Sequence, residues 1–316
     1  RNGGNGTIHV SGGNVNITVT GATGAEAIIF GSEFTGAVVQ VRNSTATATM
    51  QIAQRANIGG THLVMDSGGN VKVQSVVGSE SAPVLSNARV GSSGGSVSLV
   101  EVETNKAYAY SRVNNIASIT GGGIRTAGAV EVIAFTSSKA NAESVGTFKA
   151  TLAAVGKLYA EAVACDSTVA NITGAVIYAS SVTVDAKGIT MSRTYGGVPG
   201  SVTLADVTTL QGVAAIGSKD GSAKNTVKAY IGSAASIITN RDVSIAAYNA
   251  GDVQMTLQNK FSVNAVEVGN ASLTSYAYML TEAGVHSGAS VRTTSKDGDV
   301  EIYARDYLRE YESIDD

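Results

Sequence analysis

Cysteine, proline and tryptophan are nearly absent from this chain of 316 residues, which contains one cysteine, two prolines and no tryptophan. A single cysteine excludes an intramolecular disulfide bond and a CxxC zinc site, and we expect Cys165 to be an inert, packed thiol. Charged residues make up 15% of the chain and the formal net charge is -3. This balance gives no electrostatic basis for binding nucleic acid or an anionic membrane. No stretch approaches the ~20 apolar residues of a membrane-spanning helix, so we expect no membrane insertion.

Signals for catalysis or metal binding are also scarce. The histidines are His9, His62 and His286. None is spaced as a metal ligand, and we expect each to be solvated. The glycine-rich turns at 93–95 and 121–123 lead into no GxxxxGKS or GxxxxGKT sequence, so no phosphate-binding loop is predicted. Asp297 and Asp299 come nearest to a calcium-binding turn but lack its GGxGxD sequence. We therefore predict no catalytic, cofactor-binding or metal-binding residues, and no cofactor.

What the chain has in abundance is glycine, 37 residues, and short strand-like sequences. A recurring element is valine, any residue, then isoleucine, valine or leucine, placed just after a turn. Its eight copies begin at Val15, Val71, Val97, Val130, Val182, Val202, Val243 and Val300. Such alternation is typical of a strand with one buried face, and quasi-periodic strand units indicate a solenoid. We therefore predict an all-β solenoid.

The spacing of these copies is uneven, from about twenty to nearly sixty residues. We interpret the long intervals as two or three coils whose middle members have drifted, and an insertion is the alternative. With roughly twenty residues per coil and strands ~4.8 Å apart, the chain would form about fifteen coils and an elongated rod on the order of 70 Å. Aliphatic side chains would point inward, and threonine, serine, asparagine and tyrosine would point outward.

A second element leads from a tyrosine-containing strand to a small residue, a polar residue and then isoleucine or valine. Its copies contain Tyr108, Tyr159, Tyr230 and Tyr276. One copy falls in the alanine-rich segment 141–165, which also fits a helix because four of its bulky apolar residues have helical spacing. Gly146 and Gly156 interrupt that pattern, and the segment matches strands elsewhere in the chain. We therefore favour a strand.

The stretch 228–247, KAYIGSAASIITNRDVSIAA, resembles the repeats of filamentous-haemagglutinin-type bacterial adhesins and is most similar to those of leukotoxin-type filamentous adhesins. The resemblance is strongest over residues 202–304 and fainter over 97–184. It implies a right-handed parallel β-helix, export through an outer-membrane partner, and a role as the rod of a surface or secreted protein. It places no catalytic or ligand residue on this chain, in which the amino-terminal secretion domain of such proteins is not found.

We predict one continuous β-helix of irregular repeats over residues 1–304. A charged and aromatic tail at 305–316 either is flexible or docks on a neighbour as a strand or helix. The amino end lacks the apolar core of a signal peptide, so we expect a mature, processed or partial chain. Neither end shows a convincing cap for its strand edges, and we expect further repeats of a longer chain, or identical subunits stacked head to tail, to fill them. The outer-face residues expected to contribute to assembly are Tyr108, Tyr110, Tyr230, Tyr276, Tyr278, Tyr307 and Tyr311.

The expected function is that of a non-catalytic structural rod of a bacterial filamentous adhesin. We expect it outside the cell or on the cell surface, with host-cell or matrix molecules as further ligands. The alternative is a polysaccharide-binding or polysaccharide-degrading β-helix enzyme. A degrading enzyme would need paired carboxylates, and Asp242 with Asp252, or Glu131 with Glu143, are candidate neighbours after stacking. Because aromatics are only 5% of the chain, we interpret these acids as solvated turn charges.

Overall fold

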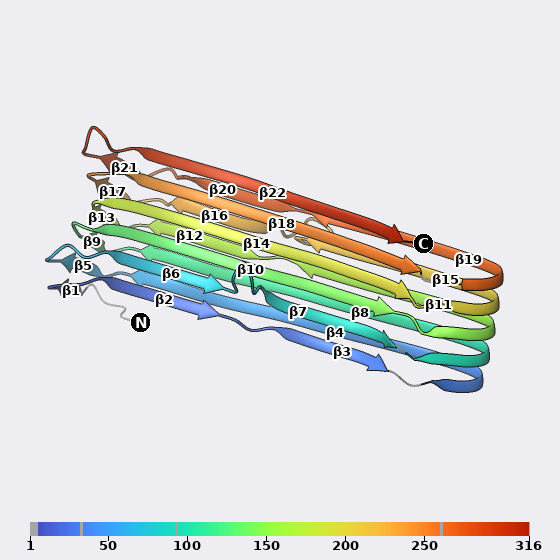
Figure 1. Ribbon diagram of the computed structural model, residues 1–316. Coiled ribbons are helices and arrows are strands. Elements are labelled where there is room, and N and C mark those ends of the chain that lie inside the picture. The colour runs from blue at the N-terminus through green and yellow to red at the C-terminus, as the bar shows by residue number, and fades with distance from the viewer. Residues whose placement is uncertain (1–5, 32–33, 93, 260–261, 316) are drawn as a thin grey trace.

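The computed structural model describes residues 6–31, 34–92, 94–259 and 262–315. Within them every regular element is a strand, and the 22 strands pair in parallel. The chain winds in successive coils, each lying on the one before it (Figure 1). The all-β fold and its parallel solenoid architecture are thus confirmed.

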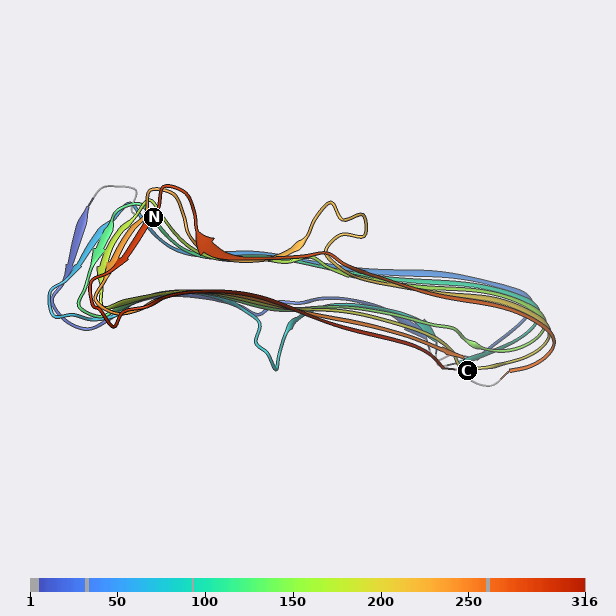
Figure 2. The same cartoon turned by 90° about the horizontal axis from the view of Figure 1, so that it is seen from above.

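Each coil has two long sides and one short side. The short sheet A closes one narrow end, and sheets B and C form the long sides and meet in a bend at the opposite end, which we call the tip (Figure 2). Sheet A contains β1 (Thr7–Val10), β5 (His62–Met65), β9 (Gly123–Arg125), β13 (Val176–Ala179), β17 (Ser236–Thr239) and β21 (Ser290–Thr293). Sheet B contains β2 (Val15–Gly21), β3 (Ala25–Gly31), β6 (Val71–Val77), β7 (Val84–Ser92), β10 (Ala129–Val145), β14 (Ser181–Val198), β18 (Val243–Asn259) and β22 (Val300–Asp315). Sheet C contains β4 (Thr35–Gly59), β8 (Gly95–Thr120), β11 (Phe148–Ala164), β12 (Ser167–Thr173), β15 (Ser201–Ile216), β16 (Asn225–Ile231), β19 (Ser262–Ala277) and β20 (Met279–Val285).

The coils are much longer than the sequence suggested. Successive partners in sheet A are separated by 55, 61, 53, 60 and 54 residues, in the series Thr7, His62, Gly123, Val176, Ser236 and Ser290. The described chain makes five complete coils and part of a sixth, so the prediction of about fifteen coils of roughly twenty residues is wrong. At ~4.8 Å per coil the stack is about 25–30 Å high, whereas a strand of the length of β8, 26 residues, follows a path of about 80 Å. The molecule is therefore a blade whose long dimension follows its strands.

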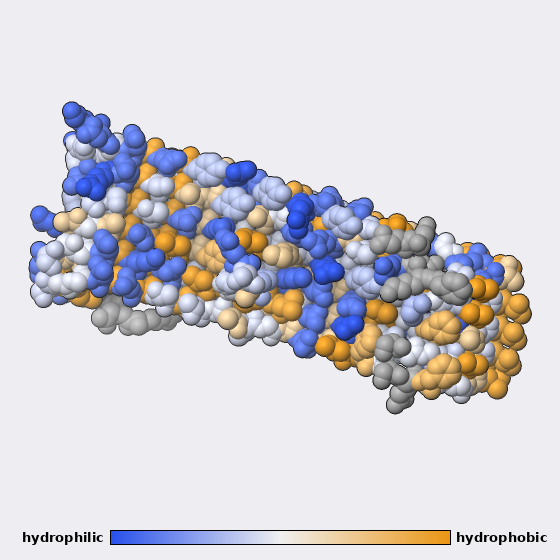
Figure 3. Space-filling view, in the orientation of Figure 1, coloured by the Kyte–Doolittle hydropathy of each residue, from blue (hydrophilic) through white to orange (hydrophobic). Residues whose placement is uncertain are grey.

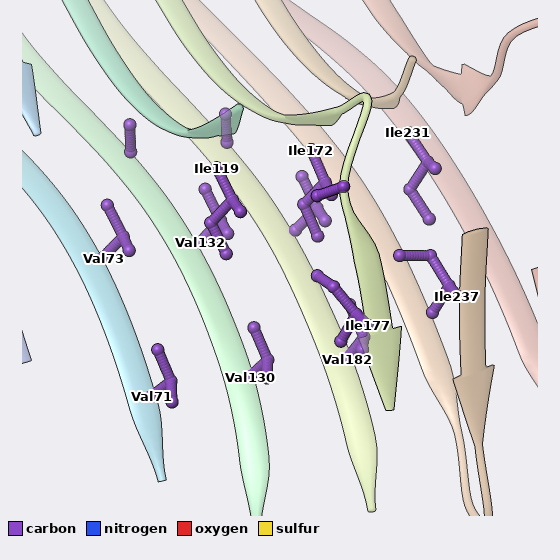
Figure 4. Close-up of a cluster of buried hydrophobic side chains, with 14 of the residues drawn as sticks. Val71, Val73, Ile119, Val130, Val132, Ile172, Ile177, Val182, Ile231 and Ile237 are labelled. Carbon is purple, nitrogen blue, oxygen red and sulfur yellow. The ribbon is translucent and has the colours of Figure 1, made fainter. Parts of the chain in front are cut away.

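Six of the eight valine elements occupy one position of the coil. Val15, Val71, Val130, Val182, Val243 and Val300 pair in this order across sheet B. The four central ones are at most 1% exposed and pack with isoleucines of sheets A and C, including Ile119, Ile177 and Ile231 (Figure 4). Because each valine lies on the valine of the coil below, the core is a set of aliphatic ladders that runs along the stack.

Toward the tip, the inside and the outside of the coil exchange character. In β8, the successive residues Leu99 and Val100 are both exposed, which shifts the alternation by one and places Glu101 and Glu103 inside. The fully enclosed Lys149 lies against Glu103 on this inner side. The expectation of aliphatic side chains inside and polar ones outside holds for the main core but is wrong at the tip.

One backbone conformation recurs at the corner between sheets C and A. Gly60, Gly121, Gly174 and Gly288 have φ values of 64°, 68°, 65° and 80° there. Ala234 takes this place in the fourth coil, with a φ of 58°, and is the one non-glycine residue of the described chain with positive φ. Left-handed φ favours glycine because a Cβ atom crowds the backbone. The turn therefore explains why glycine punctuates the sequence at coil-length intervals.

The alanine-rich segment 141–165 is extended, and the predicted strand is confirmed. Strand β10 ends at Val145, and β11 continues as a regular strand through Gly156, so the helical alternative is wrong. Strand β14 likewise continues through Gly196 and Gly197 to Val198.

Two loops interrupt the long sides of the blade. Residues 78–83, with Pro83, leave sheet B, and residues 217–224 leave sheet C (Figure 2). Strand β22 crosses the boundary placed at 304/305 and pairs with β18 from Val300 to Asp315. The charged segment at the carboxyl end is thus an edge strand in the described chain.

Candidate assembly interface

The first and last coils leave long strand edges without a partner among the described residues. Within the described ranges, β4 pairs only with β8, β19 only with β15, and β22 only with β18. Central strands such as β10 and β14 are paired on both sides. A free edge presents backbone N–H and C=O groups to which another strand can add. The two ends of the stack are therefore candidate assembly surfaces.

The aliphatic core is also uncovered at these ends. Val300 and Ile302 are 46% and 48% exposed, although the residues below them in the ladder, Val243 and Ile245, are completely buried. At the opposite end Ile8 is 45% exposed, while its ladder neighbour in the next coil is 4% exposed. A further coil laid on either end would remove this apolar surface from water.

The last coil carries carboxylates in the half of its edge nearer the tip. Asp306, Glu310 and Glu312 occupy the inward positions of β22, above three residues of β18 that are at most 1% exposed. The Thr281 hydroxyl, on the opposite sheet, donates a hydrogen bond to Asp306. Inward-pointing charge on an edge strand opposes strand addition because the incoming strand would bury it. One half of this end is thus apolar and open, and the other half is guarded by charge.

The predicted tyrosines Tyr108 and Tyr110 lie on the outer face of sheet C, with ring centroids 6.4 Å apart. Tyr159 of the next coil lies 5.5 Å from Tyr108. Beside them Glu161, 3% exposed, accepts hydrogen bonds from the hydroxyls of Tyr110 and Tyr159 and from the Nζ of Lys219, the last at 2.8 Å. Such a saturated carboxylate joins two coils and the 217–224 loop.

Protonation in this cluster follows from burial and from these contacts. Burial, together with the adjacent carboxylate, raises the pKa of the Tyr110 and Tyr159 hydroxyls. Burial alone would raise the pKa of Glu161, but hydrogen bonds from Lys219 and the two tyrosines lower it. Glu161 therefore stays ionised and bonded, which suits a structural cross-link. Sequence analysis did not single out Glu161 or Lys219. The one feature that points to Glu161 is a charged residue within a strand of alternating apolar residues.

The remaining predicted tyrosines do not join this cluster. Tyr230 stacks on His286, with centroids 4.5 Å apart, and His286 is bonded to Glu282 at 2.7 Å. Tyr276, in β19, and Tyr278, which follows that strand, lie on the side of sheet C, whereas Tyr307 and Tyr311 lie on β22 of sheet B. The predicted residues therefore lie in four separate places, and Tyr303, which was not predicted, shares the outer side of β22 with Tyr307 and Tyr311.

The acid pairs considered for a polysaccharide-degrading enzyme are wrong as neighbours. Glu131 and Glu143 lie on the same strand, β10, twelve residues and about 40 Å apart. Asp242 directly precedes β18, which contains Asp252 ten residues later. Each acid instead contacts a residue of an adjacent coil. These four acids offer no acid and base pair around one substrate.

A shallow groove of about 900 Å³ lies over sheet A and follows the stack. Arg125 and Tyr178 lie at its centre, and Asp66 lies at one side. Its other lining residues are mostly small, hydroxyl-bearing or amide side chains, among them Thr126 and Asn240. Hydroxyls and amides beside one aromatic ring suit a neutral polar chain such as a polysaccharide.

Other residues singled out from the sequence lie apart from these features. His9 Nδ1 is 3.7 Å from Asp66, and His62 is exposed. Cys165 is half-buried, and burial raises the pKa of its thiol, in keeping with low reactivity. Across the described ranges no three His, Cys, Asp or Glu side chains gather in a way that could hold a metal ion, at Asp297 and Asp299 or elsewhere. The same residues contain no helix with the length and hydrophobicity to cross a bilayer.

Comparison with known proteins gives no match to a family model, to a curated protein or to a solved structure. The resemblance to filamentous adhesins therefore rests on the sequence repeats alone.

Proposed function

We propose that this chain is a non-catalytic structural segment of a filamentous bacterial adhesin, secreted or held on the cell surface, and that further solenoid coils cover its two ends. The exposed core at both ends of the stack carries the proposal. Val300 and Ile302 continue ladders that are completely buried one coil below, and Ile8 continues another at the opposite end. The covering coils belong either to the same polypeptide or to identical subunits stacked head to tail.

The role is mechanical. Backbone hydrogen bonds run along the stack between coils, and each added coil lengthens the assembly by ~4.8 Å. Repeated addition turns a blade into the elongated rod. We expect the winding to be right-handed, because parallel strand connections almost always are. Host-cell or matrix molecules would bind the outer face.

A tandem fusion tests coil-on-coil addition directly. Two copies are joined through a flexible linker from residue 316 to residue 1, and amide hydrogen exchange is compared with that of the single chain. If coils stack, β22 of the first copy and β4 of the second become protected, while β10 is unchanged. Unchanged exchange in both edge strands would overturn end stacking. Negative-stain electron microscopy of the single chain shows whether the covering coils come from identical subunits or from the same polypeptide. Identical subunits form filaments whose length grows with concentration.

The groove over sheet A supports a second candidate, the binding of a polysaccharide. Its aromatic and hydroxyl-bearing walls are the observation that favours this function. Binding of the chain to an array of neutral glycans is the test, with Tyr178→Ala as the variant, since the Tyr178 side chain is 47% exposed. Glycan binding that survives this substitution would place the site elsewhere.

A further inference from the structure

The outer surface of the tip is an unbroken strip of aliphatic side chains, which we call the tip strip. Five strands of sheet C contribute, through residues 38–41, 97–102, 150–155, 202–207 and 263–268. The large side chains of the strip that are 40–71% exposed are Val38, Val39, Val41, Val97, Leu99, Val100, Leu152, Val155, Val202, Leu204, Val207, Val263, Val266 and Val268. They gather at the end of the blade where sheets B and C meet, where hydrophobic residues colour the surface (Figure 3).

The strip is regular along the stack. Val41, Val102, Val155, Val207 and Val268 pair in this order, so one ladder consists of valine in all five coils. The other outward positions of these segments hold only valine, leucine and alanine. The spacing between neighbouring side chains is the ~4.8 Å of the strands.

The polar residues of the same segments point the other way. Glu101 and Asp206 occupy inward positions and are 0% and 5% exposed. Burial raises the pKa of the Glu101 carboxyl even though the Ser96 hydroxyl donates a hydrogen bond to it. Enclosing carboxylates while exposing valines is the reverse of what a free surface favours. A large exposed apolar patch of this kind marks an interaction surface.

The residue types of the tip strip limit the kind of partner that can bind it. Surfaces that lie in a membrane interface combine apolar side chains with tryptophan, tyrosine, lysine or arginine, and sugar-binding surfaces use aromatic platforms. The outward positions of the strip have none of these residues. Two ladders of the same aliphatic residues with equal spacing, by contrast, interdigitate into a dry interface.

We propose that the tip strip binds the tip strip of a second copy of this chain. A two-fold axis perpendicular to the stack makes such a contact self-complementary and closed. The central strand of the five, β11, then lies opposite its own copy, and Leu152 faces Leu152. Each of the fourteen aliphatic side chains has a total surface of about 100 Å², of which about half is exposed. Together they offer on the order of 700 Å² of exposed apolar surface. This approaches the ~800 Å² per partner of a standard interface.

Tip pairing does not depend on the proposed end stacking, because the strip and the coil ends are different surfaces. End stacking is open and gives growing particles, whereas tip pairing stops at two. In a filament the strip would continue from one subunit to the next, so the two contacts are compatible.

Sedimentation velocity over about 1–100 µM protein tests the proposal. We expect a monomer–dimer equilibrium for the unmodified chain and a dissociation constant at least ~100-fold weaker for Leu152→Glu combined with Leu204→Glu, which buries four carboxylates in the dimer. Leu85→Glu is the matched control, since Leu85 is 38% exposed on the outer face of sheet B. It should leave the equilibrium unchanged.

Cross-linking identifies the contact. Leu152→Cys in a Cys165→Ser background should form a covalent dimer with a short bis-maleimide, and Leu85→Cys in the same background should not. A monomer at every concentration, or a dimer that persists in the double glutamate variant, overturns the proposal. If the monomer instead co-sediments with phosphatidylcholine vesicles and the double variant does not, the strip binds lipid and self-pairing is wrong.

Discussion

The Nζ atom of Lys149 lies 3.3 Å from Oε2 of Glu103, and both side chains are at most 3% exposed. The Thr147 hydroxyl and the Asn105 amide also donate to Glu103, at 2.8 and 2.9 Å. Removing the cation leaves a carboxylate buried without its charge partner. We expect Lys149→Met to lower the free energy of unfolding by about 3–5 kcal/mol, measured by urea denaturation.

An exposed ion pair provides the control for this prediction. Lys72 Nζ lies 3.5 Å from Glu131 on the outer face, and both side chains are about one-third exposed. Lys72→Met should cost less than about 1 kcal/mol because water solvates the remaining carboxylate. If Lys149→Met and Lys72→Met lower the free energy of unfolding equally, the buried pair contributes no more to stability than the exposed one.

Asp166 is a buried carboxyl that forms no salt bridge with any described residue. It accepts a hydrogen bond from the backbone N–H of Val113 at 2.9 Å and others from the Ser138 and Thr190 hydroxyls. Burial raises its pKa from 3.8 to about 6. Since the folded state then holds the proton more tightly than the unfolded chain, the contribution of Asp166 to stability is greatest at low pH. It is lost as the pH rises from about 4 to about 6, by on the order of 3 kcal/mol.

Asp166→Asn should remove this pH dependence, because the amide keeps an acceptor for Val113 and carries no charge. Urea denaturation of the parent and the variant at pH 4 and pH 7 is the measurement. Asp220, fully exposed, has its pKa lowered to about 2 by the Ser222 and Ser218 hydroxyls, so Asp220→Asn should retain the parent's fall in stability over this range. An identical pH response of Asp166→Asn and the parent would contradict the prediction.

Ala234 occupies a corner position where the other coils have glycine. Its left-handed φ of 58° costs an alanine more than a glycine. We expect Ala234→Gly to raise the free energy of unfolding by about 0.5–1 kcal/mol. Gly174 has a φ of 65°, and a Cβ added there would lie no closer than 3.8 Å to a neighbouring atom. The reverse change, Gly174→Ala, should therefore lower the free energy of unfolding by a similar amount through backbone strain alone. The idea fails if both substitutions shift stability in the same direction.

The inward carboxylates of β22 disfavour head-to-tail stacking of identical subunits. A neighbouring coil would bury the carboxylates of Asp306, Glu310 and Glu312. The triple variant with Asn, Gln and Gln at these positions should form longer end-to-end assemblies than the parent, measured by light scattering and electron microscopy. Glu301→Gln, an outward acid of the same strand, should not. Unchanged particle length in the triple variant would show that the acids do not guard this edge.

The sequence predicted the strands better than the coil. Period-2 alternation identifies the faces of a strand, and the valines at 71, 130, 182 and 243 do share one ladder. Alternation does not reveal which strand is the neighbour. Strands of 17 to 26 residues are far longer than the usual five or six, so an interval of nearly sixty residues was interpreted as several coils instead of one.

The candidate surfaces were predicted only in part, for related reasons. The sequence around Leu99 reads as alternating apolar residues, and the rule that apolar side chains face the core selects the wrong side. A one-residue shift at the bend reverses the pattern, and such a shift depends on three-dimensional geometry. The tyrosines at 108 and 110 were found, but Glu161, whose carboxylate accepts a hydrogen bond from Tyr110, comes from the next coil.

The length of the coil has a consequence for the order in which the molecule folds. Every strand bonds to one that is 52–61 residues away in the chain, so no local hairpin can form first and each ladder must wait for a whole further coil. Closing such loops is slow compared with forming local contacts. A coil that is already in place supplies the template for the next, which favours growth in one direction as the chain becomes available. The strand edges at the two ends of the described stack are of the same kind as the surfaces on which each of its coils was assembled.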